Sequence, residues 1–141
     1  MNSVDQTDLR TLTINALREG TAGLDAFDDL FKRCSDAFEQ GDDKAGHKQI
    51  AELLGHLRDF AVFCGAILEH SQAWIPASSV DELTAANQVF ERTLHALLSG
   101  YEAGDVISVA DVLRIDFCDV MNRYRGLFPR LAQQMECEAG V

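Results

Sequence analysis

The stretch from Leu97 to Leu131 constrains the fold more tightly than any other part of the chain. Near its start, Gly104 and Asp105 form a stop and a restart, because glycine adopts the left-handed conformation that ends a helix and aspartate caps the next one. Apolar side chains then recur at alternating spacings of three and four residues, which places them on one helix face. They are Val106, Ala110, Leu113, Phe117, Val120, Tyr124, Leu127 and Leu131. The stretch therefore predicts a helix end followed by a long amphipathic helix.

The same periodicity predicts further helices before this stretch. The first carries Leu17, Gly20, Leu24, Phe27, Phe31, Cys34 and Phe38, the second Ile50, Leu53, Leu57, Phe60, Cys64 and Ile67, and the third Leu83, Phe90, Leu94, Leu97 and Tyr101. We expect helices at about 15–40, 43–72, 79–102 and 105–135. Short connections between helices of this length favour antiparallel neighbours. The sequence therefore predicts one all-α domain, residues 1–141, folded as an antiparallel up-down four-helix bundle.

The N-terminal segment is the least defined part of this prediction. Residues 1–8 are polar, and we expect them to be frayed. Residues 9–14 fit either a short extended piece or a poorly formed first turn. Asn15 is a candidate cap for the first helix.

Two other local signals predict helix boundaries. Ser79 and Glu82 have the spacing of a capping box, which places the start of the third helix at Ser79. Pro129 removes a backbone donor from the last helix, so we expect a kink or fraying near Gly126.

The charge balance narrows the possible partners. The chain has 12 Lys and Arg against 23 Asp and Glu, a formal net charge of −11. Nucleic acid and anionic membrane both require clustered positive charge, so neither is an expected partner. The sequence contains no long apolar run and no basic start followed by an apolar segment, so we expect neither a membrane span nor a signal peptide.

Cysteine usage indicates a reducing compartment. The four cysteines are widely spaced and form no CxxC or CxxCH pair, which argues against a zinc ribbon, a thioredoxin-type site and a c-type haem. Cys34 and Cys64 lie on apolar helix faces and are expected to be small core residues. We therefore expect a cytoplasmic protein with free thiols.

The sequence offers no convergent catalytic group. No acidic residue has a histidine three positions later, as a di-metal carboxylate bundle requires, and no nucleophile motif or phosphate loop is present. The pairs Glu52–His56 and Glu91–His95 have a spacing that fits either a metal or a solvated surface pair. We predict no catalytic residue and no cofactor, and keep a metal or small ligand held by these pairs as the alternative.

A few residues are candidates for binding. Asn87 lies on an apolar stripe, where it is either a backbone-bonded amide or a buried residue that fixes helix register or touches a ligand. Trp74 and Ile75 lie in a connection, where they either cover the end of the bundle or contact a partner. Arg114 and Arg123, with Arg125 and Arg130, either dock an acidic partner or balance acids of neighbouring helices.

The order of these signals is similar to that of small bacterial helical-bundle proteins without an assigned activity. The pattern comprises F-x-x-G-D-D, L-L-G-x-L-x-x-F-x-x-F and L-L-x-x-x-E-x-G-D-x-x-x-x-A-D-x-L. In architecture it resembles flagellar export chaperones, which are cytoplasmic bundles that bind an unfolded protein segment. The resemblance implies a non-catalytic interaction module, such as an adaptor or an export-chaperone-like protein, with a protein partner or a second copy in a homodimer.

Overall fold

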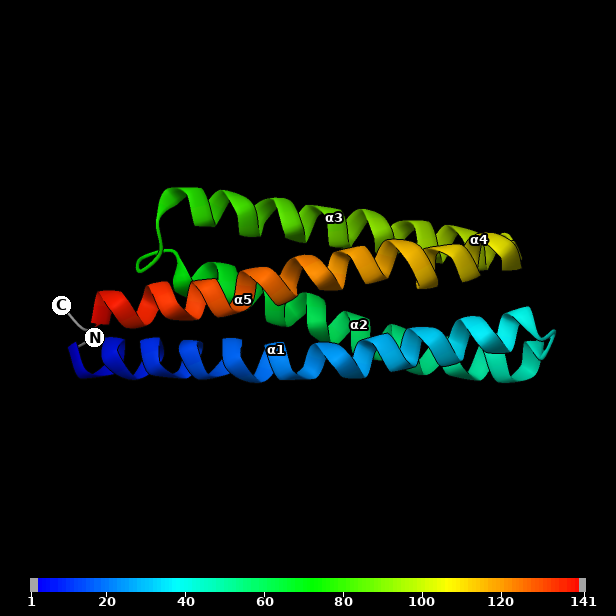
Figure 1. Ribbon diagram of the computed structural model, residues 1–141, viewed down its shortest axis with the longest axis horizontal. Coiled ribbons are helices and arrows are strands. Elements are labelled where there is room, and N and C mark those ends of the chain that lie inside the picture. Colours follow the sequence, from blue (N-terminus) through cyan, green and yellow to red (C-terminus); the bar gives the residue numbers. More distant parts are fainter. Residues whose placement is uncertain (1–2, 140–141) are drawn as a thin grey trace.

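The computed structural model describes residues 3–139 of the chain, with side chains described for residues 8–137. The elements are α1 (Ser3–Glu39), α2 (Asp43–Ser71), α3 (Ala77–Glu102), α4 (Val106–Asp111), a π-helical turn (Val112–Asp116) and α5 (Phe117–Ala139). Successive long helices run in opposite directions, with α4 and the π-helical turn leading directly into α5 (Figure 1). This confirms the predicted all-α bundle.

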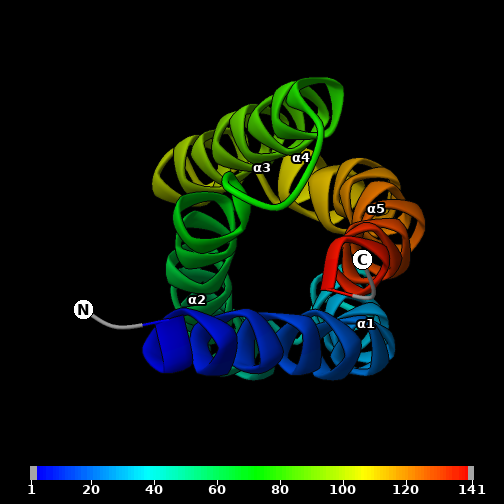
Figure 2. The ribbon, with the colours of Figure 1, turned by 90° about the vertical axis from the view of Figure 1, so that its left-hand side faces the viewer.

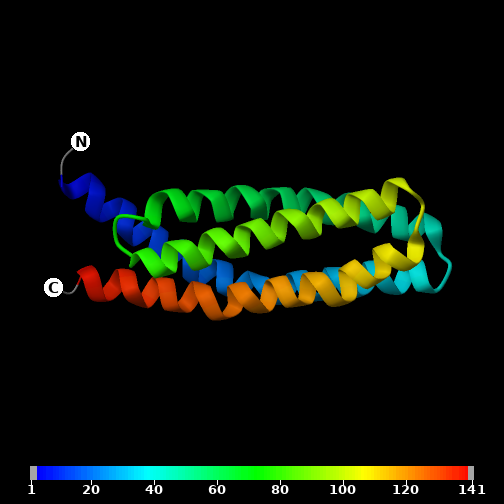
Figure 3. The ribbon, with the colours of Figure 1, turned by 90° about the horizontal axis from the view of Figure 1, so that it is seen from above.

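Viewed from one end, the long helices occupy the corners of a square (Figure 2). α1 lies beside α2 and α5, and α3 closes the opposite side. The view from above shows that the N-terminal part of α1 crosses the axis of the bundle at an angle (Figure 3). The two sides of α1 therefore pack against different neighbours, and its N-terminal turns lie over the C-terminal half of α2.

The start of α1 differs from the sequence prediction. Residues 3–8 and 9–14 are helical, so the expected fraying and the extended alternative are both wrong within the described residues, while residues 1 and 2 lie outside them. Asn15 is therefore an interior residue and no cap. Thr13 is buried beside α2, and its hydroxyl donates to the Leu9 carbonyl of the same helix at 2.8 Å. Packing thus overrides the weak helix propensity of threonine.

The start of α3 also differs from the prediction. Pro76 precedes the first residue, Ala77, and proline at this place needs no hydrogen-bond partner of its own. Ser79 is buried and donates its hydroxyl to Gln134 Oε1 at 2.9 Å, while Glu82 forms an ion pair with Arg130. The predicted capping box is therefore wrong, because both of its side chains are used between helices.

The stop and restart predicted at Gly104 and Asp105 is present, and a second one lies at Gly41 and Asp42. Gly104 has φ of +69° and Gly41 has φ of +76°, a conformation that favours glycine. The Asp105 carboxylate accepts the Ser108 backbone N–H at 3.1 Å, and the Asp42 carboxylate accepts that of Ala45 at 3.2 Å. These hydrogen bonds satisfy donors that the first turn of a helix leaves free.

The helical segment formed by α4, the π-helical turn and α5 departs from α geometry at a place that the sequence did not indicate. The π-helical turn lies at Val112–Asp116, whereas α5 runs unbroken through Pro129. The fraying expected near Gly126 is therefore not found, and the kink that was the other possibility stays a prediction. Phe128 and Leu131 on either side of the proline are buried, and their packing compensates for the single hydrogen bond that proline removes.

An aromatic cluster forms the middle of the core. The Phe60 ring of α2 lies 5.3 Å from that of Phe27 in α1, 5.5 Å from Phe90 in α3 and 5.2 Å from Tyr124 in α5, between ring centroids. Such pairs stabilise beyond the area they bury. One side chain of α2 thus contacts aromatic rings of the other three long helices.

Candidate functional site

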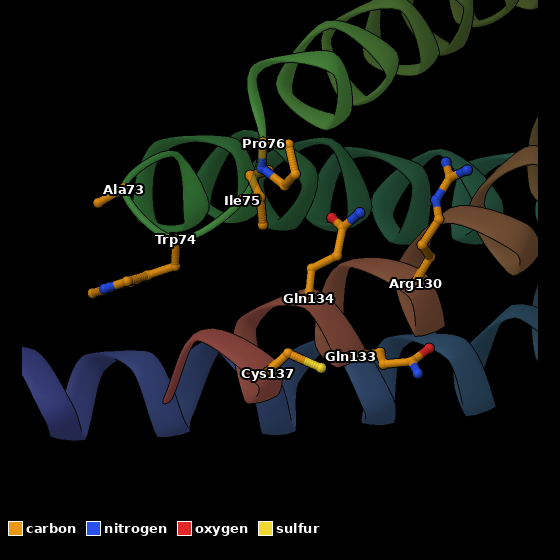
Figure 4. Close-up of a pocket in the computed structure, with 8 residues that line it drawn as sticks. All are labelled: Ala73, Trp74, Ile75, Pro76, Arg130, Gln133, Gln134 and Cys137. Carbon is orange, nitrogen blue, oxygen red and sulfur yellow. The ribbon is translucent and has the colours of Figure 1, made fainter. Parts of the chain in front are cut away.

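An open pocket of about 750 Å³ lies between the α2–α3 connection and the last turns of α5 (Figure 4). It lies at the end of the bundle where α3 diverges from α5 (Figure 1). Its lining residues are Ala73, Trp74, Ile75, Pro76, Arg130, Gln133, Gln134 and Cys137. We call it the Trp74 pocket. Its volume is in the range of sites that hold a small ligand or a few side chains.

One wall of the Trp74 pocket is apolar and belongs to the connection between α2 and α3. Pro76 has φ of −62° and ψ of 154°, and proline also disfavours helical geometry at Ile75 before it. The chain therefore leaves α2 and presents Trp74, Ile75 and Pro76 in succession. Ile75 is only 8% exposed and packs in the core, whereas Trp74 is half-buried. Ile75 covers the end of the bundle, and the indole remains partly open.

The indole of Trp74 is held from the side of α1. The guanidinium carbon of Arg10 lies 5.2 Å from the centroid of the indole ring, within the range of a cation–π interaction. Figure 4 shows the indole extending to one side of the pocket, while Ile75 points toward Gln134. A partner would therefore meet an indole that is already fixed in orientation.

The opposite wall is polar and comes from a single face of α5. Arg130, Gln133, Gln134 and Cys137 have i, i+3, i+4, i+7 spacing, so they lie along one side of the helix. Gln134 Oε1 accepts the Ser79 hydroxyl, which fixes the amide and leaves its nitrogen as a donor. The Arg130 guanidinium pairs with Glu82. This wall offers amide groups whose chemistry matches that of a peptide backbone.

The sequence prediction found the apolar wall, but of the polar wall it named only Arg130. Trp74 and Ile75 are brought together as neighbours in the connection, but Arg10, Gln133 and Gln134 come from distant parts of the chain. The only sequence signal for the polar wall was the pair of adjacent glutamines on an amphipathic helix, on the same side as Arg130. The contact of Arg10 with Trp74 could not be predicted, because it depends on the angle at which α1 crosses the bundle.

Of the predicted arginine candidates, Arg130 lines the Trp74 pocket and the other three lie elsewhere. Arg114 pairs with Glu39 of α1, and Arg123 is exposed on α5. Arg125 lies between Asp25, at 2.9 Å, and Asp28. Ion pairs to neighbouring helices thus occupy Arg114 and Arg125, as they do Arg130, which fits the interpretation that these arginines balance acids within the bundle.

Asn87 lies in a polar bridge inside the core. Its Oδ1 accepts the Tyr124 hydroxyl at 2.7 Å, and its Nδ2 donates to the Cys64 carbonyl at 3.4 Å. The bridge joins α3 to α5 and α2, as a register-fixing residue does. Burial raises the pKa of the Cys64 thiol to about 12, and burial likewise raises the pKa of the Tyr124 phenol. Both groups are therefore protonated at neutral pH. This is expected of residues with a structural role, whereas a nucleophilic cysteine must be deprotonated.

The alternative metal site has no geometric support. Glu52, His56, Glu91 and His95 are all exposed. Among the side chains of residues 8–137, no group of three or more His, Cys, Asp or Glu is placed to hold a metal ion. Structural and catalytic zinc sites use four and three protein ligands, respectively.

Comparison with known proteins gives no relative from which a role can be transferred. No protein-family model, curated protein or solved structure matches the chain. Among the described helices, none combines the length and the apolar character that crossing a membrane requires. The function must therefore be argued from the surface of the bundle itself.

Proposed function

We propose that the protein is a non-catalytic protein–protein interaction module, of an adaptor or export-chaperone-like kind, which binds a short segment of a partner protein in the Trp74 pocket. The observation that supports this proposal is the pairing of an apolar wall at Trp74 and Pro76 with an amide wall at Gln133 and Gln134, across an open 750 Å³ hollow. We also propose a cytoplasmic location, because a reducing compartment suits four free cysteines.

The two walls would bind different parts of the partner segment. An apolar side chain of the partner would lie against Trp74 and Pro76, where burial of apolar area drives binding. The backbone of the same segment would exchange hydrogen bonds with the amides of Gln133 and Gln134. Aromatic anchors of this kind often carry most of the binding energy of an interface.

The sole tryptophan of the chain makes this proposal directly testable. Peptides selected from a random display library on the immobilised protein would be measured by calorimetry and by the fluorescence of Trp74. We expect binding to shift the emission of the indole, and Trp74→Ala to weaken the affinity at least about tenfold, which corresponds to about 1.4 kcal/mol. Gln134→Ala should also weaken binding.

Arg123→Ala is the control, because Arg123 is exposed on α5 and does not line the pocket. It should leave the affinity unchanged. Selected peptides that bind Trp74→Ala as tightly as the unchanged protein would refute the proposal, as would a turnover activity that is lost on mutating a polar residue of the core.

A further inference from the structure

A second surface follows the outer seam between α1 and α2. Three hollows, of about 190, 530 and 330 Å³, lie in line along it. The first two share Phe63, and the second and third share Leu30 and Arg33. They therefore form one groove, which we call the α1–α2 groove. From Leu9 to Arg33 it is about 36 Å long at 1.5 Å per residue.

The residues along the α1–α2 groove repeat with the period of a coiled coil. On α2 they are Glu52, His56, Asp59, Phe63, Ala66 and His70, at alternating spacings of four and three. On α1, Leu9, Leu12, Ala16, Gly23, Ala26 and Leu30 keep the same heptad register. Two antiparallel helices with stripes of this period provide the holes into which a third helix packs its side chains.

Two glycines shape the floor of the groove. A Cβ at Gly20 would lie 2.9 Å from Phe63 Cζ, so the absence of a side chain lets the Phe63 ring lie against α1. A Cβ at Gly23 would have no neighbour within 4 Å, so the groove is open there. Leu12 is 65% exposed in the first hollow. The groove thus combines apolar side chains with room for close approach.

The charges of the groove select among possible occupants. Glu52 and Asp59 are exposed on the α2 stripe, one heptad apart. Of the cations that line the groove, Arg33 pairs with Asp29 at 2.9 Å, and Lys48 lies at the end of the third hollow, one turn before Glu52. The chain carries a net charge of −11, which opposes the approach of a second copy and attracts a cationic partner. A basic helix would place its positive flank beside Glu52 and Asp59.

We propose that the α1–α2 groove binds an amphipathic α-helix of a partner protein, with an apolar heptad seam facing the groove and Lys or Arg along the flank beside α2. This surface is separate from the Trp74 pocket, and the proposal does not depend on it. Helix recognition by an apolar groove with complementary charge is a recurring mode of protein binding.

The probe is a synthetic peptide of three heptads with Leu at positions a and d, Lys at e and g, and Ala elsewhere, compared with a twin that has Glu in place of Lys. Fluorescence anisotropy of the labelled peptides gives the dissociation constants. We expect the Lys peptide to bind at a ratio of one to one, and at least about tenfold more tightly than the Glu twin, with a difference that shrinks as salt is added.

Gly23→Leu fills the groove at a position with free space, and Gly65→Leu is the matched control on the exposed opposite side of α2, where a Cβ also meets nothing within 4 Å. Gly23→Leu should reduce the affinity for the Lys peptide at least tenfold, and Gly65→Leu should leave it unchanged. Joint replacement by Glu52→Lys and Asp59→Lys should reverse the preference between the peptides. Thermal unfolding followed by circular dichroism establishes that each variant is folded.

Equal binding of the two peptides would overturn the proposal, as would an equal loss in the two glycine variants. Light scattering supplies a third outcome. If the protein has twice its chain mass of 15.6 kDa and Gly23→Leu makes it a monomer, the groove is occupied by a second copy and the partner-helix proposal is wrong.

Discussion

The Tyr124 hydroxyl shows how much a single polar atom can matter inside an aromatic core. Tyr124 is fully buried and its hydroxyl donates to Asn87, whereas Tyr101 is half-buried and its hydroxyl lies 2.6 Å from Nδ1 of the exposed His47. The two tyrosines of the chain therefore make similar bonds in different surroundings. Loss of a buried partner leaves an unsatisfied group, while water replaces an exposed one.

We predict that Tyr124→Phe lowers the free energy of unfolding by about 1–2 kcal/mol, because Asn87 Oδ1 loses its donor within the core. Urea unfolding measures this change. Tyr101→Phe is the matched control and should change stability by less than about 0.5 kcal/mol. If the two substitutions have equal effects, or if Tyr124→Phe and Asn87→Ala are additive in a double-mutant cycle, the bridge does not contribute as we infer.

Along a helix, the sequence predicted what depends on near neighbours and missed what depends on distant ones. The stop at Gly104 and the restart at Asp105 follow from local conformation and capping, and both are present. Ser79 satisfied the same local rules, but its predicted role as a helix cap is wrong. Its hydroxyl donates instead to Gln134, which is far along the chain. The π-helical turn had no sequence signal at all.

In the Trp74 pocket, too, the sequence predicted the residues whose role is local and missed those whose role depends on distant parts of the chain. Trp74 was identifiable because a large apolar residue in a connection must find cover or a partner. Gln134 and Arg10 were not, since their role depends on how α5 and α1 meet the connection. Composition and periodicity specify which face of a helix is buried, but they do not specify which polar residues gather at the end of a bundle.

Two glycines of α1 provide a test at the level of packing between helices. We predict that Gly23→Ala stabilises the protein by about 1 kcal/mol, the usual gain in helix propensity. Gly20→Ala should be at least about 1 kcal/mol less stable than Gly23→Ala, because its Cβ meets the Phe63 ring, which is confined by Phe60 and Phe128. Thermal and urea unfolding would measure both variants.

In a protein that also carries Phe63→Leu, Gly20→Ala should stabilise the fold about as much as Gly23→Ala does, because the shorter leucine leaves space for the Cβ at position 20. The same replacement should leave the effect of Gly23→Ala unaltered. Equal stabilisation by the two alanine substitutions would show that the Phe63 ring moves aside without a penalty.

At the scale of the whole bundle, we expect truncation of Phe60 to remove contacts with more helices than truncation of any other aromatic side chain described above. Its ring, which belongs to α2, contacts aromatic rings from the other three long helices. We predict that Phe60→Ala lowers the free energy of unfolding by about 3–5 kcal/mol, through lost burial and the cavity left behind. Leu12→Ala, at a position that is 65% exposed, should change it by less than about 0.5 kcal/mol.

Urea unfolding followed by both circular dichroism and Trp74 fluorescence would test this prediction. In the unchanged protein the two signals should give one midpoint, as expected for a cooperative domain of this size. Phe60→Ala should shift both midpoints together. A small effect, or a shift in only one signal, would mean that the four helices do not share one cooperative core.

The placement of the start of α1 and the end of α5 has a mechanical consequence. Both lie at the end of the bundle where α2 is connected to α3 (Figure 1), so a force applied between them peels α1 away from α5 instead of sliding one along the other. Among the ion pairs between these two helices, the load reaches Arg18–Glu136 first, then Arg125 with Asp25 and Asp28. The protein should therefore unzip stepwise at low force. Because α5 supplies the amide wall of the pocket, tension would release a bound segment before the aromatic core opens.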